Sequence, residues 1–509
     1  MIVLVLCMAI LFGGLSVLTA FAEDSVTIYD KSVLRDGVND VNAKTVSYGG
    51  YEWYVIGYDG RDGDGGDGTL SPSGTMTLIA KDRIGDDVIF DNTDPYENKY
   101  ASSDLRTAIE TIYSGFLSSV EKSAIQTRML SNNGGTCTSG AECDCINGDV
   151  VEDAALWPLS LKEANSMNSY LRTFSVAWWL RSPGFNDTNA AVVTPGGRVF
   201  FNGAFVNDNL GVRPAFYVNL DSVLFTSEIS SSSGYKLALI KDALTVNNPT
   251  FVSLSDYVAT ITYDDTSEGL KHLAIVVSST GTDETPGTDM RGTYVELTDD
   301  KIVSFTIPES FRCQDYSIYV APVEKNVENN SDYVGAWTKI KDVLLVREII
   351  EPTAVKSLVY DKTEKTLVTE GSVTCASVSY ALGSESESPV LDSDIWSSTI
   401  PTGTLADSYH VWWCASGTNY QKNPEMVTVN INPKPVGLAW NTTNFIRTGV
   451  TEPPTATATG VVEGDTVAVT VTGSQIENAY TATVDGLTGE DASNYFLPSE
   501  NTVTYTIQP

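Results

Sequence analysis

Two kinds of hydrophobic spacing divide the chain. Apolar side chains recur at helical intervals from Leu105 to Phe116, which predicts a helix with one buried face. Ser118 and Ser160 are each followed by Glu at the third position, the pattern of a capping box at a helix start. After Ser182 the pattern changes to short β-like runs, and AAVVTPGGRVFF places a Pro-Gly-Gly turn between two strands. The first part of the chain is therefore predicted to be an α+β head.

From about Ser227 onward the helical spacing disappears. Runs such as YVATITY, KIVSFTI and DTVAVTVTG alternate between apolar and polar residues and are separated by turn residues, as expected of β-sandwiches. A Ser-rich stretch, Pro352 and the Pro433-Lys434-Pro435 triplet separate these runs into groups. We predict a multidomain chain whose head is followed by tandem all-β sandwiches. The expected parts are a leader at 1–22, the head at 23–226, and β modules at 227–349, 350–433 and 436–509.

The N-terminus resembles a secretory signal peptide. Residues 2–18 are almost wholly apolar, and Ala20-Phe21-Ala22 forms a small-residue cleavage site. The alternative is an uncleaved anchor, because the apolar run approaches the length of a membrane span. We expect cleavage after Ala22 and a protein that is secreted or held on the cell surface. The sequence stops at a strand end without a sorting signal, so we expect attachment to the envelope through a C-terminus beyond Pro509.

The net charge of −34 narrows the classes of partner. Such acidity repels phosphate backbones, so nucleic-acid binding is not expected. It also disfavours docking on anionic membranes. The expected partner is an extracellular protein or glycan, and the charge itself is typical of a solvated surface.

Cysteine placement fits an exported chain. Of the seven cysteines, Cys7 lies in the apolar leader, which leaves an even number in the mature chain. Cys137, Cys143 and Cys145 share a Gly-rich loop without His, which favours a local disulfide over a zinc site with four ligands. Cys375 and Cys414 lie on two strand-like segments of one β module, and we expect them to form a disulfide.

Two motifs of the head carry a family resemblance. They are WWLRSPG at Trp178–Gly184 and GVRPAF at Gly211–Phe216, and they are accompanied by YEWYVIGYDG from Tyr51 and LWPLSLKEAN from Leu156. Together they resemble an uncharacterised family of bacterial surface domains, the domain of unknown function numbered 6273, over about residues 26–226. The motif pair also resembles the C-type-lectin-like fold of formylglycine-generating enzymes. The resemblance implies a C-type-lectin-like head without a settled activity.

The last module, 436–509, resembles the Ig-like MBG modules of Gram-positive surface proteins. Its runs DTVAVTVTG, AYTATVDGL and TVTYTIQ alternate cleanly, although the motif is loose. This resemblance implies a Gram-positive type of bacterial host and a stalk of Ig-like modules.

The head lacks the residues of common catalytic systems. His272 and His410 both lie in the β modules, which excludes a His-dependent nucleophile or a His metal site in the head. No Cys lies near Trp178–Phe216, so the chemistry of formylglycine-generating enzymes is not expected. The acidic loop Asp59–Gly68 fails the EF-hand calcium pattern. We expect no enzymatic activity, cofactor or metal, although a carboxylate pair of the glycosidase type stays an open alternative.

The insert between the two motifs has the composition of a recognition surface. Residues 185–216 contain two Asp and two Arg, and they also contain five Phe and five Asn. Exposed aromatic rings supply contact area and amides supply adaptable hydrogen bonds. Phe200 and Phe201 are adjacent in a strand, so we expect them to point to opposite faces. The candidate ligand-binding residues are Phe185, Asn186, Asn189, Arg198, Phe201, Asn202, Phe205, Asn207 and Asn209.

The same insert contains no Lys, Glu, Gln, Trp or Met. These are the residues that randomised adenines in an AAC or AAT codon cannot encode. Diversity-generating retroelements mutate C-type-lectin-like target proteins in this way, which suggests a variable ligand-binding face.

Trp178, Trp179, Arg181 and Arg213 are interpreted as a structural frame around the insert. Buried indole N–H groups and guanidinium groups need hydrogen-bond partners, which would tie loops together. The sequence therefore predicts an exported ligand-binding or adhesion protein that presents a variable face. The alternatives are a structural envelope or assembly protein and a carboxylate-dependent glycosidase.

Overall fold

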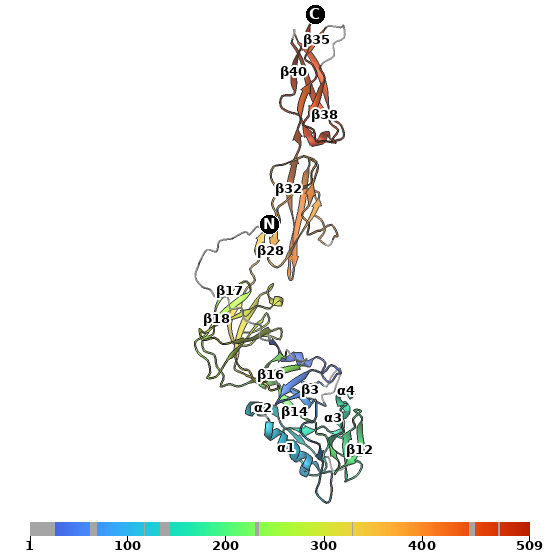
Figure 1. Ribbon diagram of the computed structural model, residues 1–509, viewed down its shortest axis with the longest axis vertical. Helices are drawn as coiled ribbons and strands as arrows, with labels where there is room; N and C mark the ends of the chain where they lie inside the picture. The colour runs from blue at the N-terminus through green and yellow to red at the C-terminus, as the bar shows by residue number, and fades with distance from the viewer. Residues whose placement is uncertain are drawn as a thin grey trace, which may run out of the picture. The chain divides into compact units, whose positions relative to one another are not determined.

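The computed structural model describes residues 26–61, 69–116, 118–132, 143–229, 234–327, 329–391, 393–446, 454–476 and 479–508. The chain divides into two compact units, Met1–Leu344 and Leu345–Pro509. Strands dominate both units, and the α-helices lie in the first unit (Figure 1). The protein is thus multidomain and mostly β. Among the described residues, no helix combines the length and the apolar character needed to cross a bilayer.

One large sheet runs through the first unit. It contains 14 strands of the described chain, with β24 (Thr338–Val343) beside β22 and β9 (Trp157–Pro158) beside β14. Most neighbours are antiparallel, but β16 pairs in parallel with both β2 and β23. In spatial order the remaining strands are β15 (Val223–Glu228), β1 (Thr27–Tyr29), β20 (Arg291–Glu296), β19 (His272–Ser278), β22 (Tyr316–Glu324), β23 (Asp332–Val334), β16 (Gly234–Ile240), β2 (Thr45–Tyr48), β3 (Tyr51–Tyr58), β4 (Thr75–Ala80), β14 (Pro214–Asn219) and β6 (Ile125–Gln126).

The helices of the first unit begin where the sequence predicts them. In α2 and α3 the side chains of Ser118 and Ser160 each accept a hydrogen bond from the Glu N–H three positions on, and that Glu carboxylate accepts one from the Ser N–H. Both predicted capping boxes are confirmed. The helices are α1 (Asp104–Phe116), α2 (Ser119–Ala124), α3 (Leu161–Ser166) and α4 (Ser169–Arg172). Short 3-10 helices are η1 (Lys31–Arg35), η2 (Tyr100–Ser102), η4 (Leu220–Ser222), η5 (Glu309–Phe311) and η6 (Ala492–Asn494).

Smaller sheets complete the first unit. The first motif and the insert form a separate three-stranded sheet in the order β10-β11-β12, which we call the insert sheet, and α3 packs against β10 and β12. The second motif leads instead into β14 of the large sheet. A second layer, β17-β18-β21, covers a core that includes Ile261 and Ile275. The strands of these smaller sheets are β5 (Val88–Ile89), β7 (Arg128–Leu130), β8 (Val151–Ala154), β10 (Trp178–Pro183), β11 (Asn189–Val193), β12 (Val199–Phe205), β13 (Asn209–Leu210), β17 (Thr250–Ser255), β18 (Val258–Thr262) and β21 (Ile302–Thr306).

The expected boundary between the head and the first β module lies inside a strand. Thr226 and Ser227 are both in β15, which pairs with β1 from the start of the head and with β16 from the module. Strand β1 also pairs with β20, so the sheet is continuous from 27 to 343. The boundary at 226/227 therefore does not separate two compact units, because the backbone hydrogen bonds of one sheet cross it.

The second unit contains both C-terminal modules. Its larger sheets are β26-β32-β31-β29 and β35-β40-β38-β37, and β33 pairs in parallel with β39 across the expected boundary near 433–436. The strands are β25 (Ile349–Ile350), β26 (Leu358–Val359), β27 (Lys365–Thr366), β28 (Ser372–Val373), β29 (Ser377–Gly383), β30 (Thr402–Gly403), β31 (Ser408–Gly417), β32 (Tyr420–Asn432), β33 (Lys434–Pro435), β34 (Gly437–Trp440), β35 (Asn444–Ile446), β36 (Ala456–Thr459), β37 (Ala468–Ile476), β38 (Ala479–Thr488), β39 (Tyr495–Phe496) and β40 (Thr502–Gln508).

The cysteine pairing differs from the prediction. Cys414 carries a free, buried thiol, whereas Cys375 is disulfide-bonded to a different cysteine. The predicted Cys375–Cys414 disulfide is therefore wrong. Cys375 lies in the turn between β28 and β29, with φ +59°, rather than on a strand as the sequence pattern suggested. Cys143 is also disulfide-bonded, while Cys137 lies outside the described residues.

Candidate functional site

The insert sheet is built on two buried tryptophans. Trp178 and Trp179 begin β10, and neither side chain is exposed. The indole N–H of Trp179 donates to the Val88 carbonyl at 2.7 Å, and that of Trp178 donates to the Arg172 carbonyl at 3.3 Å. Both therefore pack into the core while satisfying their polar atom, as the frame interpretation expects.

Arg181 connects the first motif to a capping box. Its guanidinium contacts the Glu163 carboxylate and also lies 2.6 Å from an Asp144 oxygen. Glu163 additionally accepts a contact from Arg128 at 2.5 Å. Burial alone would raise the pKa of the Glu163 carboxyl, but the two guanidinium groups outweigh it and lower this pKa to about 2. Sequence spacing identified Glu163 only as a helix cap, so its second role was missed.

Arg213, in the second motif, is buried without an ion pair to any residue that the structure describes. It donates to the carbonyls of Ala80 at 3.0 Å and Leu171 at 3.1 Å. Its guanidinium also lies 5.1 Å from the Trp178 ring centre, a cation–π distance. Burial lowers the pKa of Arg213 to about 10, so the group stays charged at neutral pH. These contacts place Arg213 in the frame rather than on a ligand-facing surface.

The two adjacent phenylalanines of β12 lie at a bulge. Phe200 and Phe201 are both half-buried and both pack against the main core of the head. The β11–β12 register shifts between Ala190 and Val192, and Gly203 in this bulge has φ +74°. A Cβ on Gly203 would lie 2.1 Å from the Ala190 carbonyl oxygen, so the bulge requires glycine. A bulge interrupts the regular alternation of a strand, and the opposite orientation of the two rings stays a prediction.

The outer part of the insert faces water. Phe185 is 74% exposed and Phe205 is 60% exposed. The Phe185 N–H donates to the Asn202 carbonyl at 3.3 Å, which places these two residues side by side. Phe205 and Asp208 close a tight turn with Asn207 at its tip. We call Phe185, Asn202, Phe205 and Asn207 the insert face.

The amides of the insert fall into two groups. Asn186 accepts hydrogen bonds from the Thr188 N–H and hydroxyl, both at 3.0 Å, so its side chain shapes the 185–189 turn. The amide side chains of Asn202, Asn207 and Asn209 are exposed and make no hydrogen bond to another described side chain or backbone group. The second group is therefore available to a ligand, whereas Asn186 is committed to the turn. Asn189 is half-buried opposite Phe205 on β11.

Arg198 lies apart from the insert face. It sits in the β11–β12 turn, where the Thr194 N–H donates to its carbonyl at 2.9 Å. Phe205 is at the other end of β12, roughly 20 Å away at the usual rise per strand residue. The exposed Arg198 guanidinium lies 5.8 Å from the Phe200 ring centre. The structure thus brings most of the predicted ligand-binding residues together but leaves Arg198 outside.

Asn98 also belongs to the frame that supports the insert, and the sequence did not indicate this role. It is 2% exposed, and its amide N–H groups donate to the carbonyls of Asn186 at 2.9 Å and Asn189 at 2.7 Å. Its oxygen accepts a hydrogen bond from Asn147 at 2.6 Å. One buried amide therefore fixes the turn that presents Phe185. No local pattern around Asn98 indicates this role, because the partners are about ninety residues away.

The structure brings no metal site to the insert. Among the described residues no group of three or more His, Cys, Asp or Glu could hold a metal ion. Most of the acidic loop Asp59–Gly68 lies outside the described residues. The chemistry available at the insert face is therefore ring contact and amide hydrogen bonding.

A comparison with protein-family models supports the family resemblance of the two head motifs. The family described as "Domain of unknown function (DUF6273)" matches residues 74–220. This match covers both motifs, the insert and α1 to α4.

Solved structures give only distant similarity. The FN1–FN3 domains of chicken CNTN1 are 9% identical, cover 52% of this chain and 89% of their own, and have a TM-score of 0.17. A tetra-tandem repeat in the extending region of a large adhesion protein is 10% identical, covers 62% of this chain and 78% of its own, and also has a TM-score of 0.17. At these scores neither superposition defines the fold. No curated protein matches the chain.

Proposed function

We propose that this chain is an exported surface protein that binds an extracellular protein or glycan through the insert face, without catalysis. The observation that carries the proposal is the contrast between the buried frame and the two exposed rings of Phe185 and Phe205. A disulfide-bonded chain with a leader-like N-terminus supports export, because disulfides persist in oxidising compartments.

The energetic argument concerns ring burial. Two exposed Phe side chains offer on the order of 200 Å² of apolar area, which at about 25 cal/mol per Å² corresponds to about 5 kcal/mol on full burial. A micromolar complex has a binding free energy of about 8 kcal/mol, and ordering costs reduce any area-based figure. The rings would therefore act as anchors, with the amides of Asn202 and Asn207 supplying hydrogen bonds around them.

The frame explains why this face could vary without unfolding the head. The hydrogen bonds that shape the insert come from backbone groups and from the side chains of Asn98, Asn186 and Asp208, rather than from the side chains of the insert face. Substitution at Phe185, Asn202, Phe205 and Asn207 would leave those bonds in place. This supports diversification by a retroelement. A reverse-transcriptase gene beside a near-copy of the segment coding for 185–210 would test it, and an invariant insert among closely related strains would contradict it.

A C-type-lectin-like head is part of the same proposal. It is supported by the pairing of β1 with β15, which joins the two ends of the head, and by the long insert that leaves the main sheet and returns. A crystal structure of residues 26–344, superimposed on C-type-lectin-like domains, tests the assignment. A head that aligns better with another α+β fold would overturn it.

The binding experiment uses two matched variants of the full chain. Phe185→Ala with Phe205→Ala removes both anchors, while Tyr170→Ala with Phe496→Ala removes two exposed rings elsewhere, which are 63% and 49% exposed. Both variants should keep the melting temperature within a few degrees, because exposed side chains add little to stability. Binding at about micromolar concentration to a glycan array or a panel of purified extracellular proteins should disappear only in the first variant.

Three results would contradict the proposal. Equal binding by both variants would place the site elsewhere. Concentration-dependent self-association that the first variant abolishes would favour the assembly protein. Release of reducing sugar from polysaccharides by the purified chain would favour the glycosidase.

A further inference from the structure

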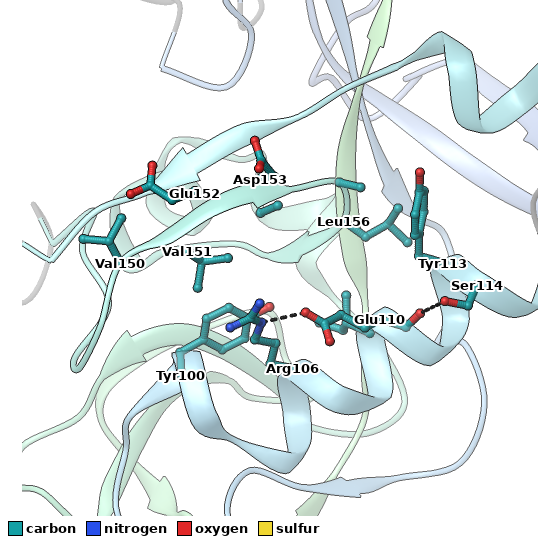
Figure 2. Close-up of a pocket in the computed structure, with 13 residues that line it drawn as sticks. Tyr100, Arg106, Glu110, Tyr113, Ser114, Val150, Val151, Glu152, Asp153 and Leu156 are labelled. Carbon is teal, nitrogen blue, oxygen red and sulfur yellow. Dashed lines mark hydrogen bonds and ion pairs between the residues drawn. The ribbon is translucent and has the colours of Figure 1, made fainter.

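A second recess in the head lies away from the insert face. It is a cleft of about 570 Å³ between α1 and β8, and Figure 2 shows the α1 side chains facing those of residues 150–156 across it. The volume is within the usual range for small-molecule pockets. Neither sequence motif contributes to it, and none of the candidate ligand-binding residues lines it.

The floor and one wall of the cleft are apolar. Ile109, Val151 and Leu156 line it and are 1%, 5% and 5% exposed. The Tyr113 ring stands at one side, near the far end of the cleft (Figure 2). A ligand that enters must therefore present an apolar face to these side chains.

The rim of the cleft carries two available carboxylates. Glu152 and Asp153 are exposed on β8 and form no ion pair or hydrogen bond through their side chains with other described residues. Glu110, on the opposite side, is paired with Arg106 at 2.7 Å (Figure 2). The pair is neutral overall, so the rim has two unpaired negative charges and repels anions.

Tyr100 adds a polar group to the inside of the cleft. It is only 1% exposed, its ring lies within the cleft beside Arg106 (Figure 2), and its hydroxyl makes no hydrogen bond to any residue in the described ranges. Burial raises the pKa of Tyr100, more than the nearby Arg181 and Arg106 charges lower it. The hydroxyl therefore stays neutral and can both donate and accept. The hydroxyl is not one of the buried polar atoms left without a partner, so it reaches the space of the cleft, where water or a ligand can hydrogen-bond it.

We propose that the cleft between α1 and β8 binds a neutral sugar ring, whose hydroxyls contact Tyr100, Glu152 and Asp153. A pyranose has an apolar face for Tyr113 and Val151 and hydroxyls around its edge. Sugar hydroxyls donate to carboxylates, so a neutral sugar uses the rim charges without needing a charge of its own. A sugar oxygen accepts the Tyr100 hydroxyl proton, which an ammonium ion cannot do. An anionic ligand would be repelled by the rim.

Saturation-transfer NMR on the full chain tests this inference. The probes are methyl glycosides of glucose, galactose, mannose and N-acetylglucosamine, with glucuronate as the anionic probe and butylammonium as the cationic probe. At least one neutral glycoside should bind at millimolar concentration, with the strongest transfer to protons of its apolar face. Glucuronate and butylammonium should not compete with it.

Two cleft variants and their controls make the result specific. Tyr100→Phe should weaken sugar binding about 3- to 10-fold, the usual contribution of one hydrogen bond, without lowering the melting temperature. Glu152→Gln with Asp153→Asn should weaken it at least 10-fold, because hydrogen bonds to charged groups are stronger. Tyr170→Phe and Glu296→Gln, which remove a hydroxyl and a charge from exposed positions outside the cleft, should have no effect.

Several outcomes would overturn the inference. They are no binding by any neutral glycoside at tens of millimolar, equal binding by the cleft variants and the wild type, or salt-sensitive binding of butylammonium at the cleft. The Phe185→Ala/Phe205→Ala variant should retain sugar binding in the cleft. Failure of the cleft proposal can therefore be distinguished from failure of the proposed binding at the insert face.

Discussion

Arg181 and Glu163 form an ion pair in which the two side chains are only 1% and 2% exposed. Arg181 comes from the first motif strand, β10, and Glu163 is the capping residue of α3. The pair therefore joins the frame of the insert to the helix that packs against it. A buried pair of this kind depends on both partners, because a single buried charge is costly.

The first prediction concerns acid stability. The pKa of Glu163 is about 2 in the folded chain and its ordinary value is 4.5, so ionised Glu163 stabilises the fold above about pH 4.5. This contribution is lost as the pH falls from 4.5 through 2. Glu163→Gln should destabilise the first unit by roughly 3–5 kcal/mol at neutral pH and flatten its stability between pH 5 and 2. Urea unfolding at several pH values measures both effects.

The matched control for that prediction is Glu97→Gln. Glu97 forms a surface ion pair with Lys99 whose side chains are 38% and 45% exposed. Exposed pairs contribute about 0–1 kcal/mol, so this variant should retain the acid dependence of the wild type. A flat profile in the control, or an unchanged profile in Glu163→Gln, would contradict the assignment.

The second prediction concerns the buried tryptophans. Trp178→Ala and Trp179→Ala should each lower the free energy of unfolding by roughly 3–5 kcal/mol, because each leaves a large cavity and an unpaired carbonyl. Tyr170→Ala, at a 63% exposed aromatic position, should change it by less than about 0.5 kcal/mol. Thermal unfolding of the full chain gives the comparison. If both tryptophan variants lost less than about 0.5 kcal/mol of unfolding free energy, the two side chains would be surface residues that could contact a ligand.

The third prediction concerns the free cysteine. Burial raises the pKa of the Cys414 thiol, which keeps it in the unreactive protonated form. In the native protein Cys414 should resist iodoacetamide and become alkylated only after denaturation. Non-reducing peptide mapping should show Cys375 in a disulfide that does not include Cys414. A peptide linking the two would restore the sequence-based pairing.

The fourth prediction concerns the second unit. Asp465 has a fully buried side chain that accepts hydrogen bonds from Tyr360 at 2.8 Å and Tyr495 at 2.6 Å and lies 2.7 Å from the Lys362 amine. Burial would raise the pKa of Asp465, but these partners together lower it. Asp465→Asn should destabilise the second unit by about 1–3 kcal/mol, the usual range for hydrogen bonds to a charged group.

Differential scanning calorimetry of the full chain separates that effect from the first unit. The transition of residues 345–509 should move down while that of residues 1–344 stays in place. Asp394→Asn, at an exposed position of the same unit, is the control. If the Asp465 variant left both transitions unchanged, the two tyrosines would not depend on this carboxylate.

The sequence alone determined the features that depend on neighbouring residues. The capping boxes at Ser118 and Ser160, the stripe through Leu105 and Ile109, and the hairpin of AAVVTPGGRVFF all follow from spacings of a few positions. Local hydrogen bonds and helical periodicity fix these elements before any distant contact forms. The exposed phenylalanines of the insert were also identifiable, because composition marks such a surface.

Only the tertiary structure decided which distant segments meet. Ile28 pairs with Ser227, a residue far away in the sequence. Strand β15 therefore runs across the position where the sequence predicted a domain boundary. Asn98 reaches Asn186, and Tyr100 joins a cleft with residues 150–156, although nothing near either residue in the sequence indicates its partners. Pairing of remote strands and burial of remote polar groups depend on the packing of the whole core, so a local pattern carries no record of them.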